Sequence, residues 1–414
     1  MLIRSLNYAC GLAVSSFIAV NTLNTFRPGN TVRGKDVDRK DKDLALKQVQ
    51  VIFRHGARTP IKTISGLEEN VWDKQELRYE LEHTKLKYEV KSLNSHELKE
   101  ENSTKNVLKG GCEMGALTTV GQQQAYDLGR KLKKYYIDEL KLVDDNFDER
   151  IIYLRTTHVP RAIESLRCVV TGMFNHINEP VIFWTLPIVE EVFFPNYSAC
   201  KALKQFVKYC FTLAHKLPGY QGDLEKFMRA VGKPMKNINF IHIYDDMSCR
   251  NAHNKIYSDE VKSLMKTVEA RALQLYTSVY QSPPTWTKGM ILPLSGGHML
   301  QNLYKNIQSS IEKTSNHRLY LFSAHDATLI TLCAALDIEL KEWPSFASYV
   351  SLELYENEVC EHFVRVVFSG DVKNFKKFSK EIPIKEFKAI VDRLAIDDYE
   401  RVCNTMFDIP EQSQ

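Results

Sequence analysis

The stretch VIFRHGARTP, residues 51–60, decides how the rest of the chain is interpreted. An apolar run ends in Arg54, His55 and Gly56, and a second arginine, Arg58, follows three residues after the histidine. A histidine between two guanidinium groups is disfavoured as a resting cation, and each arginine presents a planar fork of donors that suits a tetrahedral oxyanion. The stretch therefore predicts a phosphate pocket; the alternative is a surface histidine with two solvated arginines.

Two further apolar runs end in the same way. Residues 151–154 (IIYL) are followed by Arg155, and residues 319–324 (LYLFSA) are followed by His325 and Asp326. Both are short and contain β-branched or aromatic residues, as buried parallel strands do. Ligands of open α/β sheets bind just beyond the carboxyl ends of the strands. We therefore expect the three strand ends to meet at one site.

The pattern along the chain predicts an α/β fold, with a doubly wound, mostly parallel sheet flanked by helices and a smaller, mainly helical cap domain inserted. Helices are expected at three places: after Thr118 or Thr119, from Pro160, and over residues 327–336. A strand hairpin is expected around Asn357. The α/β body is assigned to residues 36–66, 107–185 and 291–403. Residues 67–106 and 186–290 do not fit the alternation of strand and helix, and they are assigned to insertions that form the cap.

The first 35 residues differ from the rest in composition. They contain no acidic residue, and their apolar stretch over residues 9–20 is shorter than the about eighteen residues that span a bilayer. We expect residues 1–35 to be a targeting leader, either a mitochondrial transit peptide or a secretory signal, and we expect no stable membrane span.

The bulk composition is that of an ordinary globular protein, with 44% hydrophobic and 26% charged residues. The net charge of +4 is the difference between 55 basic and 51 acidic residues, so it gives no reason to expect nucleic-acid binding. The nine cysteines show no zinc-binding spacing. Cys168 and Cys333 are interpreted as core residues, and Cys200, Cys210 and Cys249 as candidates for disulfides. Oligomeric state is not predicted, and the sequons at Asn102 and Asn196 are left open.

These residues suit phosphoryl transfer, which needs a nucleophile, positive charge and a proton for the leaving group. His55 is the candidate nucleophile and Asp326 the candidate proton donor. The candidate phosphate ligands are Arg54, Arg58, Arg155 and His325. No metal or cofactor is expected, because the arginines supply the positive charge. Alone, Arg155 could equally pair with a surface acid, and Asp326 could simply cap a helix.

Other polar residues are interpreted as structural. We expect His158, His253 and His298 to be surface or loop residues. The pair Asp245 and Asp246 is expected in a solvated turn rather than in a metal or acid–base site.

The motifs RHGARTP and SAHDAT resemble the two halves of the histidine acid phosphatase family, and the resemblance runs from about residue 46 to at least residue 370. It implies the histidine phosphatase fold, a phosphohistidine intermediate on His55, and Asp326 as proton donor. His158 departs from the aspartate that many relatives have there.

The implied substrate is a lysophospholipid monoester, lysophosphatidic acid, which is cleaved to monoacylglycerol and phosphate. Alternatives are a general or phytate-type acid phosphatase, an inactive phosphate-binding relative and a phosphoglycerate-mutase-like enzyme. The resemblance favours a mitochondrial leader, with a secretory or lysosomal destination as the alternative.

Overall fold

The computed structural model describes most of the chain beyond residue 43, namely residues 44–78, 81, 84–98, 106–235, 238–255, 258–281, 283–374 and 380–408. The expected targeting leader, residues 1–35, and the sequon at Asn102 lie outside these residues. Within the described ranges, no helix is long and apolar enough to cross a membrane.

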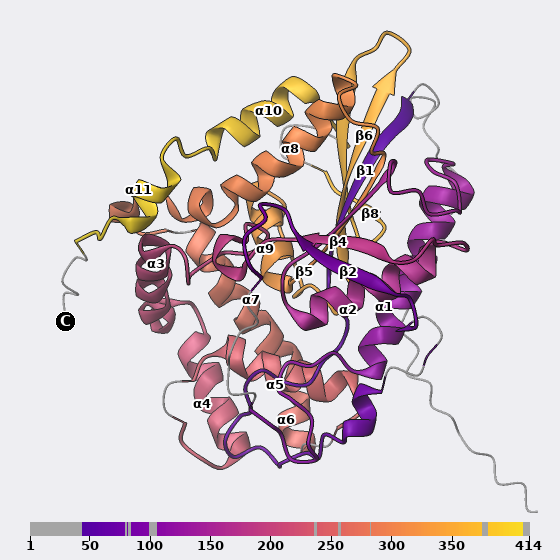
Figure 1. Ribbon diagram of the computed structural model, residues 1–414. Helices are drawn as coiled ribbons and strands as arrows, with labels where there is room; N and C mark the ends of the chain where they lie inside the picture. Colours follow the sequence, from indigo (N-terminus) through magenta and orange to yellow (C-terminus); the bar gives the residue numbers. More distant parts are fainter. Residues whose placement is uncertain are drawn as a thin grey trace, which may run out of the picture. The chain divides into compact units, whose positions relative to one another are not determined.

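A nine-stranded sheet forms the centre of the described chain (Figure 1). Its strands lie in the order β2 (Tyr88–Ser92), β4 (Val181–Thr185), β3 (Ile152–Thr156), β5 (Leu319–Ala324), β1 (Leu44–Arg54), β6 (Tyr349–Asn357), β7 (His362–Phe368) and β8 (Asp371–Val372), and β9 (Glu381–Pro383) pairs with β7. The first five strands run parallel. The strands from β6 onward pair antiparallel. The α/β prediction is confirmed, although the sheet is mixed rather than mostly parallel.

The elements predicted around the motifs are confirmed with small shifts of their ends. Thr118 caps α1 (Thr119–Leu132), and Pro160 opens α2 (Pro160–Met173). The third predicted helix is α9 (Asp326–Ala335), which begins one residue earlier than expected. The hairpin around Asn357 is formed by β6 and β7.

Helices cover both faces of the sheet. On one face, Val49, Val51 and Phe53 of β1 pack in a core with residues of α1 and α2. On the other face, Ile52 packs in a core with residues of three helices: α8 (His298–Ile311), α9 and α10 (Ile384–Arg393). Successive side chains of a strand point to opposite faces, so β1 is fixed on both sides. Its carboxyl end is thereby held rigidly at the edge of the core.

Residues 186–290 supply helices but no strand in the described ranges. These helices are α3 (Lys201–Thr212), α4 (Tyr220–Val231), α5 (Phe240–Ala252), α6 (Asp259–Ser263) and α7 (Met265–Gln281). Figure 1 shows α4, α5 and α6 grouped at one end of the fold, away from α8 and α10. Residues of α4 to α7 share a core that also takes in Ile330 of α9 and Trp343. This core joins the helical segment to the first turns of α9.

The assignment of residues 67–106 to a helical insertion is wrong for β2, which extends the sheet beside β4. Tyr88 stacks on Phe183 of β4, with ring centroids 4.8 Å apart, and Val90 packs on the same core. This strand is difficult to predict from the sequence, because an edge strand is only half-buried and only its alternate residues are apolar.

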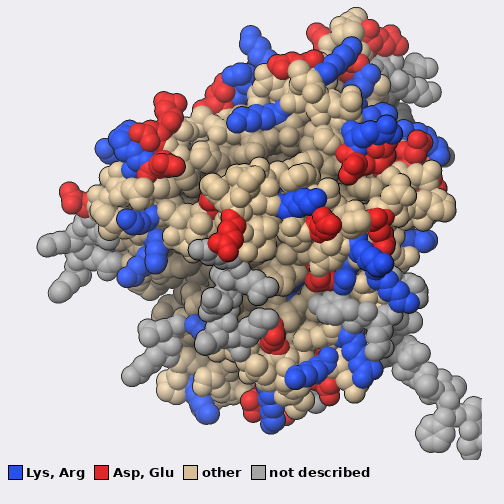
Figure 2. All heavy atoms as spheres, viewed as in Figure 1, with Lys and Arg blue, Asp and Glu red and all other residues tan. Residues whose placement is uncertain are grey.

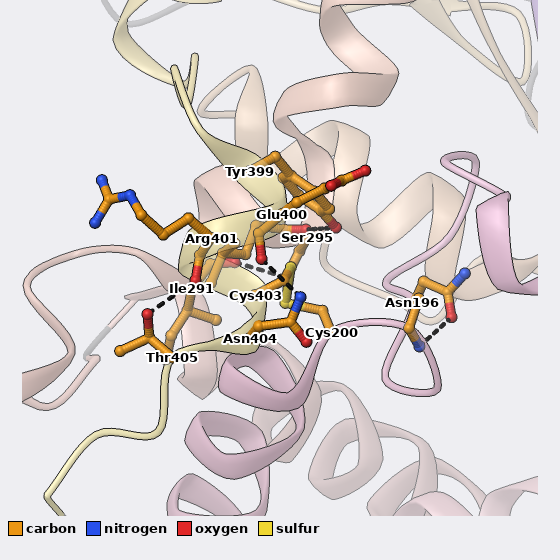
Figure 3. Close-up of a disulfide and its surroundings, with 12 residues drawn as sticks. Asn196, Cys200, Ile291, Ser295, Tyr399, Glu400, Arg401, Cys403, Asn404 and Thr405 are labelled. Atoms are coloured by element: carbon orange, nitrogen blue, oxygen red, sulfur yellow. Dashed lines mark hydrogen bonds between the residues drawn. A yellow bond between two sulfur atoms is a disulfide. The ribbon is translucent and has the colours of Figure 1, made fainter.

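A disulfide joins Cys200, which precedes α3, to Cys403 of α11 (Tyr399–Asn404), as Figure 3 shows. The disulfide prediction is correct for Cys200, but Cys210 and Cys249 are buried free thiols. Cys168 and Cys333 are buried core residues, as predicted.

The side-chain amide of Asn196 is nearly buried and is occupied within its own loop. Its Nδ2 donates to the carbonyl oxygen of Ile188 at 2.7 Å, and its Oδ1 accepts from the Ala199 amide at 3.1 Å. A glycan on this nitrogen is incompatible with the folded loop.

Charged side chains of both signs are interspersed over the face shown in Figure 2. On that face no stripe of lysine and arginine of the kind that tracks a nucleic-acid backbone is visible.

Candidate active site

His55 follows the last residue of β1, and Gly56 lets the next loop pack closely on α1. A Cβ atom on Gly56 would lie 2.0 Å from the carbonyl oxygen of Gly121, so a larger residue would push α1 away. The Gly56 amide donates to Oγ of Ser165 on α2 at 3.1 Å. The loop after the histidine is therefore fixed by both helices on this face of the sheet.

The His55 ring is buried and is oriented through both of its nitrogens. Nδ1 lies 2.8 Å from the carbonyl oxygen of Gly56, so Nδ1 carries the proton and Nε2 keeps its lone pair. Nε of Arg161 donates to this Nε2 at 3.1 Å. Burial, and then the repulsion of neighbouring arginines and His325, lowers the pKa of His55 well below its usual value. His55 is thus a neutral imidazole with its free nitrogen directed at a guanidinium group.

Arg54 is buried at the end of β1 and is held on three sides. Its Nη2 lies 2.8 Å from Oδ2 of Asp326, and its Nη1 donates to the carbonyl oxygen of Pro344 at 2.5 Å. The guanidinium group stacks 4.1 Å from the ring centroid of Phe346. Such a clamp fixes the direction of the positive charge before substrate arrives.

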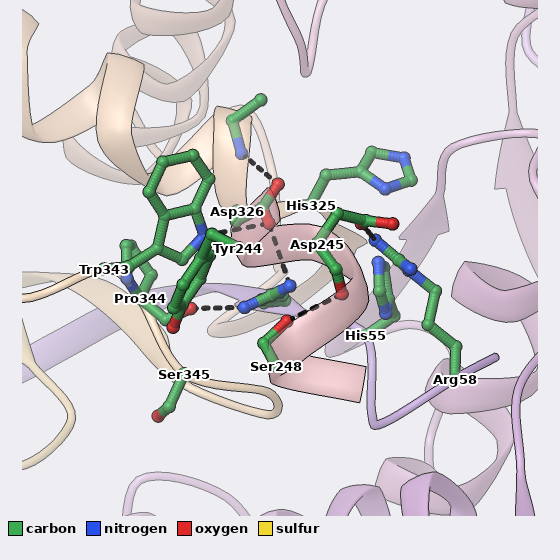
Figure 4. Close-up of polar contacts among 12 residues, drawn as sticks. His55, Arg58, Tyr244, Asp245, Ser248, His325, Asp326, Trp343, Pro344 and Ser345 are labelled. Carbon is green, nitrogen blue, oxygen red and sulfur yellow. Dashed lines mark hydrogen bonds and ion pairs between the residues drawn. The ribbon is translucent and has the colours of Figure 1, made fainter. Parts of the chain in front are cut away.

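Arg58 is also buried, and its Nη2 pairs with Oδ1 of Asp245 on α5 at 2.6 Å (Figure 4). Burial opposes the charge of Arg58, but Asp245 and Asp326 outweigh it and raise the pKa of the guanidinium group above its usual value. Among the described atoms, Nε of Arg58 and Nε of Arg54 have no hydrogen-bond partner. Buried N–H donors of this kind are suited to an anion.

The end of β5 places His325 and Asp326 beside His55, as the sequence predicted. The rings of His55 and His325 meet edge to face with their centroids 5.5 Å apart. Nε2 of His325 lies 3.0 Å from Oγ1 of Thr157. Burial and the surrounding arginines, Arg161 first among them, lower the pKa of His325 to about 3. His325 is therefore neutral, and it contributes a hydrogen bond rather than a charge.

Asp326 opens α9 and is held in its place by three donors. Oδ2 accepts from Nη2 of Arg54 and, at 3.0 Å, from Nε1 of Trp343, while Oδ1 accepts from the Ala327 amide at 2.8 Å. Burial alone would raise the pKa of Asp326, but Arg54 and Arg58, with the Trp343 hydrogen bond, lower it to about 2. The carboxylate is ionised in this arrangement.

Arg155 does not join the pocket, and the prediction that it binds phosphate is wrong. Its Nη2 pairs with Oε1 of buried Glu191 at 2.9 Å, and its guanidinium group lies over the ring of Phe193. The strand register gives the reason. Arg155 is level with Phe322 of β5, and Phe322 is level with Ile52, so Arg155 lies two residues short of the level of the pocket.

Arg161 takes the place that the sequence assigned to Arg155. It lies in the first turn of α2, and its Nε contacts the nucleophilic nitrogen of His55. Burial, with repulsion from Arg58, lowers the pKa of Arg161 to about 9. A buried arginine whose charge is opposed by a neighbouring arginine is typical of a functional site. One feature of the sequence could have indicated this role. Arg161 lies in the first turn of a helix that follows a strand, and side chains there point back toward the strand end.

The helical segment contributes Tyr244 and Asp245 to the surroundings of the site (Figure 4). Asp245 on α5 pairs with Arg58, and the ring of Tyr244 packs 5.2 Å from Trp343. The prediction of a solvated turn at Asp245 and Asp246 is therefore wrong. Asp246 is fully buried and pairs with Arg250 one helical turn later, at 2.9 Å. Acid and base four residues apart are typical of a helix, and that spacing could have predicted one here.

The three histidines expected in surface or loop positions differ in the structure. His158 lies in the loop after β3, as expected. His298 begins α8 and stacks near Tyr399, so that prediction is wrong. His253 lies in the turn after α5 but is tied down there, because its Nε2 contacts Oγ1 of Thr118 at 2.7 Å.

These groups together form a site for nucleophilic phosphoryl transfer. A neutral imidazole nitrogen faces a set of three guanidinium groups, from Arg54, Arg58 and Arg161, and a carboxylate lies beside them. The arginines suit the equatorial oxygens of a phosphoryl group, and the carboxylate lies where a leaving oxygen would need a proton.

Comparison with known proteins agrees with this geometry. Residues 45–369 match the model of the histidine phosphatase superfamily (branch 2). The chain is 32% identical to lysophosphatidic acid phosphatase type 6 of Homo sapiens over 336 residues, which cover 79% of this chain and 78% of that protein. It is 22% identical to prostatic acid phosphatase of Homo sapiens over 399 residues, which cover 89% and 90%. The solved apo structure of Hafnia alvei phytase superposes with a TM-score of 0.57 at 11% identity, covering 88% of this chain and 99% of that one.

Proposed function

Because the chain belongs to branch 2 of the histidine phosphatase superfamily and is a histidine acid phosphatase, we propose that it hydrolyses phosphate monoesters through a phosphohistidine intermediate on His55. One observation carries the proposal. The Nε2 lone pair of His55 accepts a hydrogen bond from Arg161, and Arg58 and Arg54 lie close enough to repel a proton from the ring, while its Nδ1 proton is bound by the Gly56 carbonyl oxygen. That arrangement aims an unprotonated nitrogen at the place where the arginines hold phosphorus.

The reaction proceeds in two displacements. Nε2 of His55 attacks phosphorus while the bond from phosphorus to the ester oxygen breaks, and Asp326 gives its proton to that oxygen, so the product leaves as a neutral alcohol. Water then attacks phosphorus, Asp326 takes a proton from the water, and the bond from phosphorus to Nε2 breaks. Phosphate and neutral His55 are regenerated.

The arginines account for a metal-independent reaction. Arg54, Arg58 and Arg161 surround the phosphoryl oxygens with fixed donors, which stabilise charge that spreads over these oxygens in the transition state. Asp326 reaches its acid form when a phosphate dianion lies beside it, because like charges raise a carboxyl pKa. The proton thus arrives together with the substrate.

Lysophosphatidic acid is the substrate we propose, with monoacylglycerol and phosphate as products. Support comes from the 32% identity to a phosphatase named for this lipid, over 79% of this chain. A general or phytate-type phosphatase is the alternative, since the fold is shared with a phytase.

Three substrates compared in parallel test the proposal: lysophosphatidic acid, phytate and an aryl phosphate. We expect turnover that resists chelators, stops with vanadate, and is highest in kcat/KM for lysophosphatidic acid. An acid-labile phosphoenzyme should be trapped in the wild type and not in His55→Ala. Phosphate release by His55→Ala at the wild-type rate contradicts the mechanism, and phosphate binding without any turnover would favour an inactive relative.

We also propose a mitochondrial location, supported by the acid-free composition of residues 1–35. The Cys200–Cys403 disulfide supports the secretory or lysosomal alternative, because disulfides persist in oxidising compartments. Microscopy of the full chain with a C-terminal fluorescent tag distinguishes the two destinations.

A further inference from the structure

The helical segment places a carboxylate directly on one arginine of the phosphate pocket. Oδ1 of Asp245 lies 2.6 Å from Nη2 of Arg58, and its Oδ2 accepts from the amides of Ile61 at 2.9 Å and Lys62 at 3.4 Å. Asp245 therefore connects α5 to the loop that follows the histidine motif. The mechanism above assigns no step to this carboxylate.

Asp245 faces the side of the pocket from which the leaving group departs. In an in-line displacement the leaving group lies opposite the nucleophile, so it points away from His55, and Asp326 is the acid we assign to its oxygen. Asp326, which protonates the leaving oxygen, touches Trp343, and Trp343 packs against Tyr244, the residue before Asp245. Figure 4 shows Asp245 directed toward Arg58 beside His55. The group attached to the phosphate thus passes close to this carboxylate.

The negative charge of Asp245 acts strongly there because its side chain is only 18% exposed. The nearest basic group is Arg58, its ion-pair partner, and Arg161 also interacts with it electrostatically. Beyond them are Lys62, which is exposed, and His242, whose Nδ1 lies 3.5 Å from Nζ of Lys62. Burial and Lys62 lower the pKa of His242, although Asp245 raises it, so His242 is neutral at neutral pH. Solvent screens an exposed lysine more than a partly buried carboxylate. Asp245 therefore offsets the positive charge of Arg58 on this side of the pocket, and little unpaired positive charge remains there for a second phosphate group.

We propose that Asp245 is a specificity-determining residue, which fixes Arg58 from the substrate side and excludes esters that carry further phosphate groups near the reacting one. A monophosphate with an uncharged remainder, such as a lysophospholipid, passes the carboxylate without repulsion. A polyphosphorylated substrate such as phytate brings a second anion toward it. This inference rests on the proposed function, and it names the substrate class that the same site selects.

The test is the ratio of kcat/KM for phytate to kcat/KM for an aryl monophosphate, measured in four proteins: the wild type, Asp245→Asn, Asp245→Glu and Asp223→Asn. Removing one buried charge should raise this ratio by about tenfold or more in Asp245→Asn. Asp245→Glu keeps the charge and should keep the wild-type ratio. Asp223→Asn is the matched control, because Asp223 pairs with Arg271 elsewhere in the helical segment and is 25% exposed.

An unchanged ratio in Asp245→Asn, with activity lost equally on both substrates, overturns the inference and leaves Asp245 as a support for Arg58 alone. A wild type with no activity on any monoester overturns the proposed function instead. A second measurement needs no variant. Phytate should inhibit aryl phosphate hydrolysis by the wild type no more strongly than inorganic phosphate does, and much tighter inhibition by phytate would contradict the inference.

Discussion

Arg155 and Arg161 lie six positions apart, and we expect their replacement by alanine to have opposite effects on activity and stability. Arg161 contacts the nucleophilic nitrogen of His55, whereas Arg155 pairs with Glu191 below the pocket. We expect Arg161→Ala to lose activity and keep its fold, and Arg155→Ala to lose stability and keep most of its activity.

For Arg161→Ala, the surroundings of the side chain determine the expected changes in kcat/KM and in the free energy of unfolding. Removing one preorganised donor to a developing anion reduces kcat/KM by about 10²–10³, or about 3–4 kcal/mol of transition-state stabilisation. Burial and the neighbouring Arg58 lower the pKa of Arg161 to about 9, so its charged form is held at a cost to the folded state. The free energy of unfolding of Arg161→Ala should therefore be unchanged or higher, as is common when an active-site residue is removed.

In Arg155→Ala, the buried carboxylate of Glu191 loses its ion-pair partner. The side chain of Glu191 is 0% exposed, and only the amides of Val192 and Phe193 remain to hold it, each at 2.8 Å. Breaking a buried ion pair costs about 3–5 kcal/mol, and the two amides favour the lower end of that range. The free energy of unfolding should fall by about 3 kcal/mol.

The assay combines urea unfolding with initial rates on an aryl phosphate, measured at a temperature where every variant is folded. Arg150→Ala is a suitable control, since the Arg150 side chain is 82% exposed and its partner Asp148 is itself 28% exposed. Near-wild-type activity in Arg161→Ala, together with a large loss of kcat in stably folded Arg155→Ala, would refute the assignment made from the strand register.

Three other perturbations are expected to give defined results. In Asp326→Asn, kcat on an alkyl phosphate should fall by about 10²–10⁴, and kcat on an aryl phosphate with a good leaving group should fall much less; equal losses would remove Asp326 from the role of acid. Burial and the arginines lower the pKa of His55 and His325, so between pH 6.5 and pH 3 the unfolded chain binds more protons than the folded one. The free energy of unfolding should therefore decrease as pH falls through this window, with a smaller slope in His325→Gln, and a slope that the substitution leaves unaltered would show that His325 does not contribute. Replacing both Cys200 and Cys403 by serine should cost about 2–5 kcal/mol in urea unfolding, and the wild type under reducing conditions should match the double variant.

The half of the site that lies on strand ends could be predicted from the sequence. Arg54, His55, His325 and Asp326 each follow a short apolar run, and parallel strands bring such ends together wherever they lie in the chain. Arg155 follows a run of the same kind, but the prediction that it binds phosphate is wrong. The level that a strand end reaches depends on its register with the neighbouring strands, which the local sequence does not give. Thr157, two residues later, is the residue of this segment that reaches His325.

The half of the site that lies on helices could not be predicted in this way. Arg161 and Asp245 reach the pocket only because packing orients their helices. Helix α2 packs closely on α1 at Gly129 and Gly172, and α5 packs in the core around Trp343. The place of Arg161 in the first turn after a strand is its one local signal, and Asp245 has none that shows which way it points. The i,i+4 pair of Asp246 and Arg250 predicts a helix, but the direction in which Asp245 points depends on the tertiary fold.

The two halves together set the charge that the site presents to phosphate. Three arginines and two aspartates, with both histidines neutral, leave one net positive charge among these side chains. A phosphate monoanion neutralises that charge, whereas a dianion exceeds it by one, so a dianion binds together with a proton. Asp326 is the carboxylate to which we assign this proton, because it lies beside the leaving oxygen. The second aspartate, which α5 contributes, is therefore the reason that a dianion binds together with a proton, and we expect kcat/KM to be higher below neutral pH.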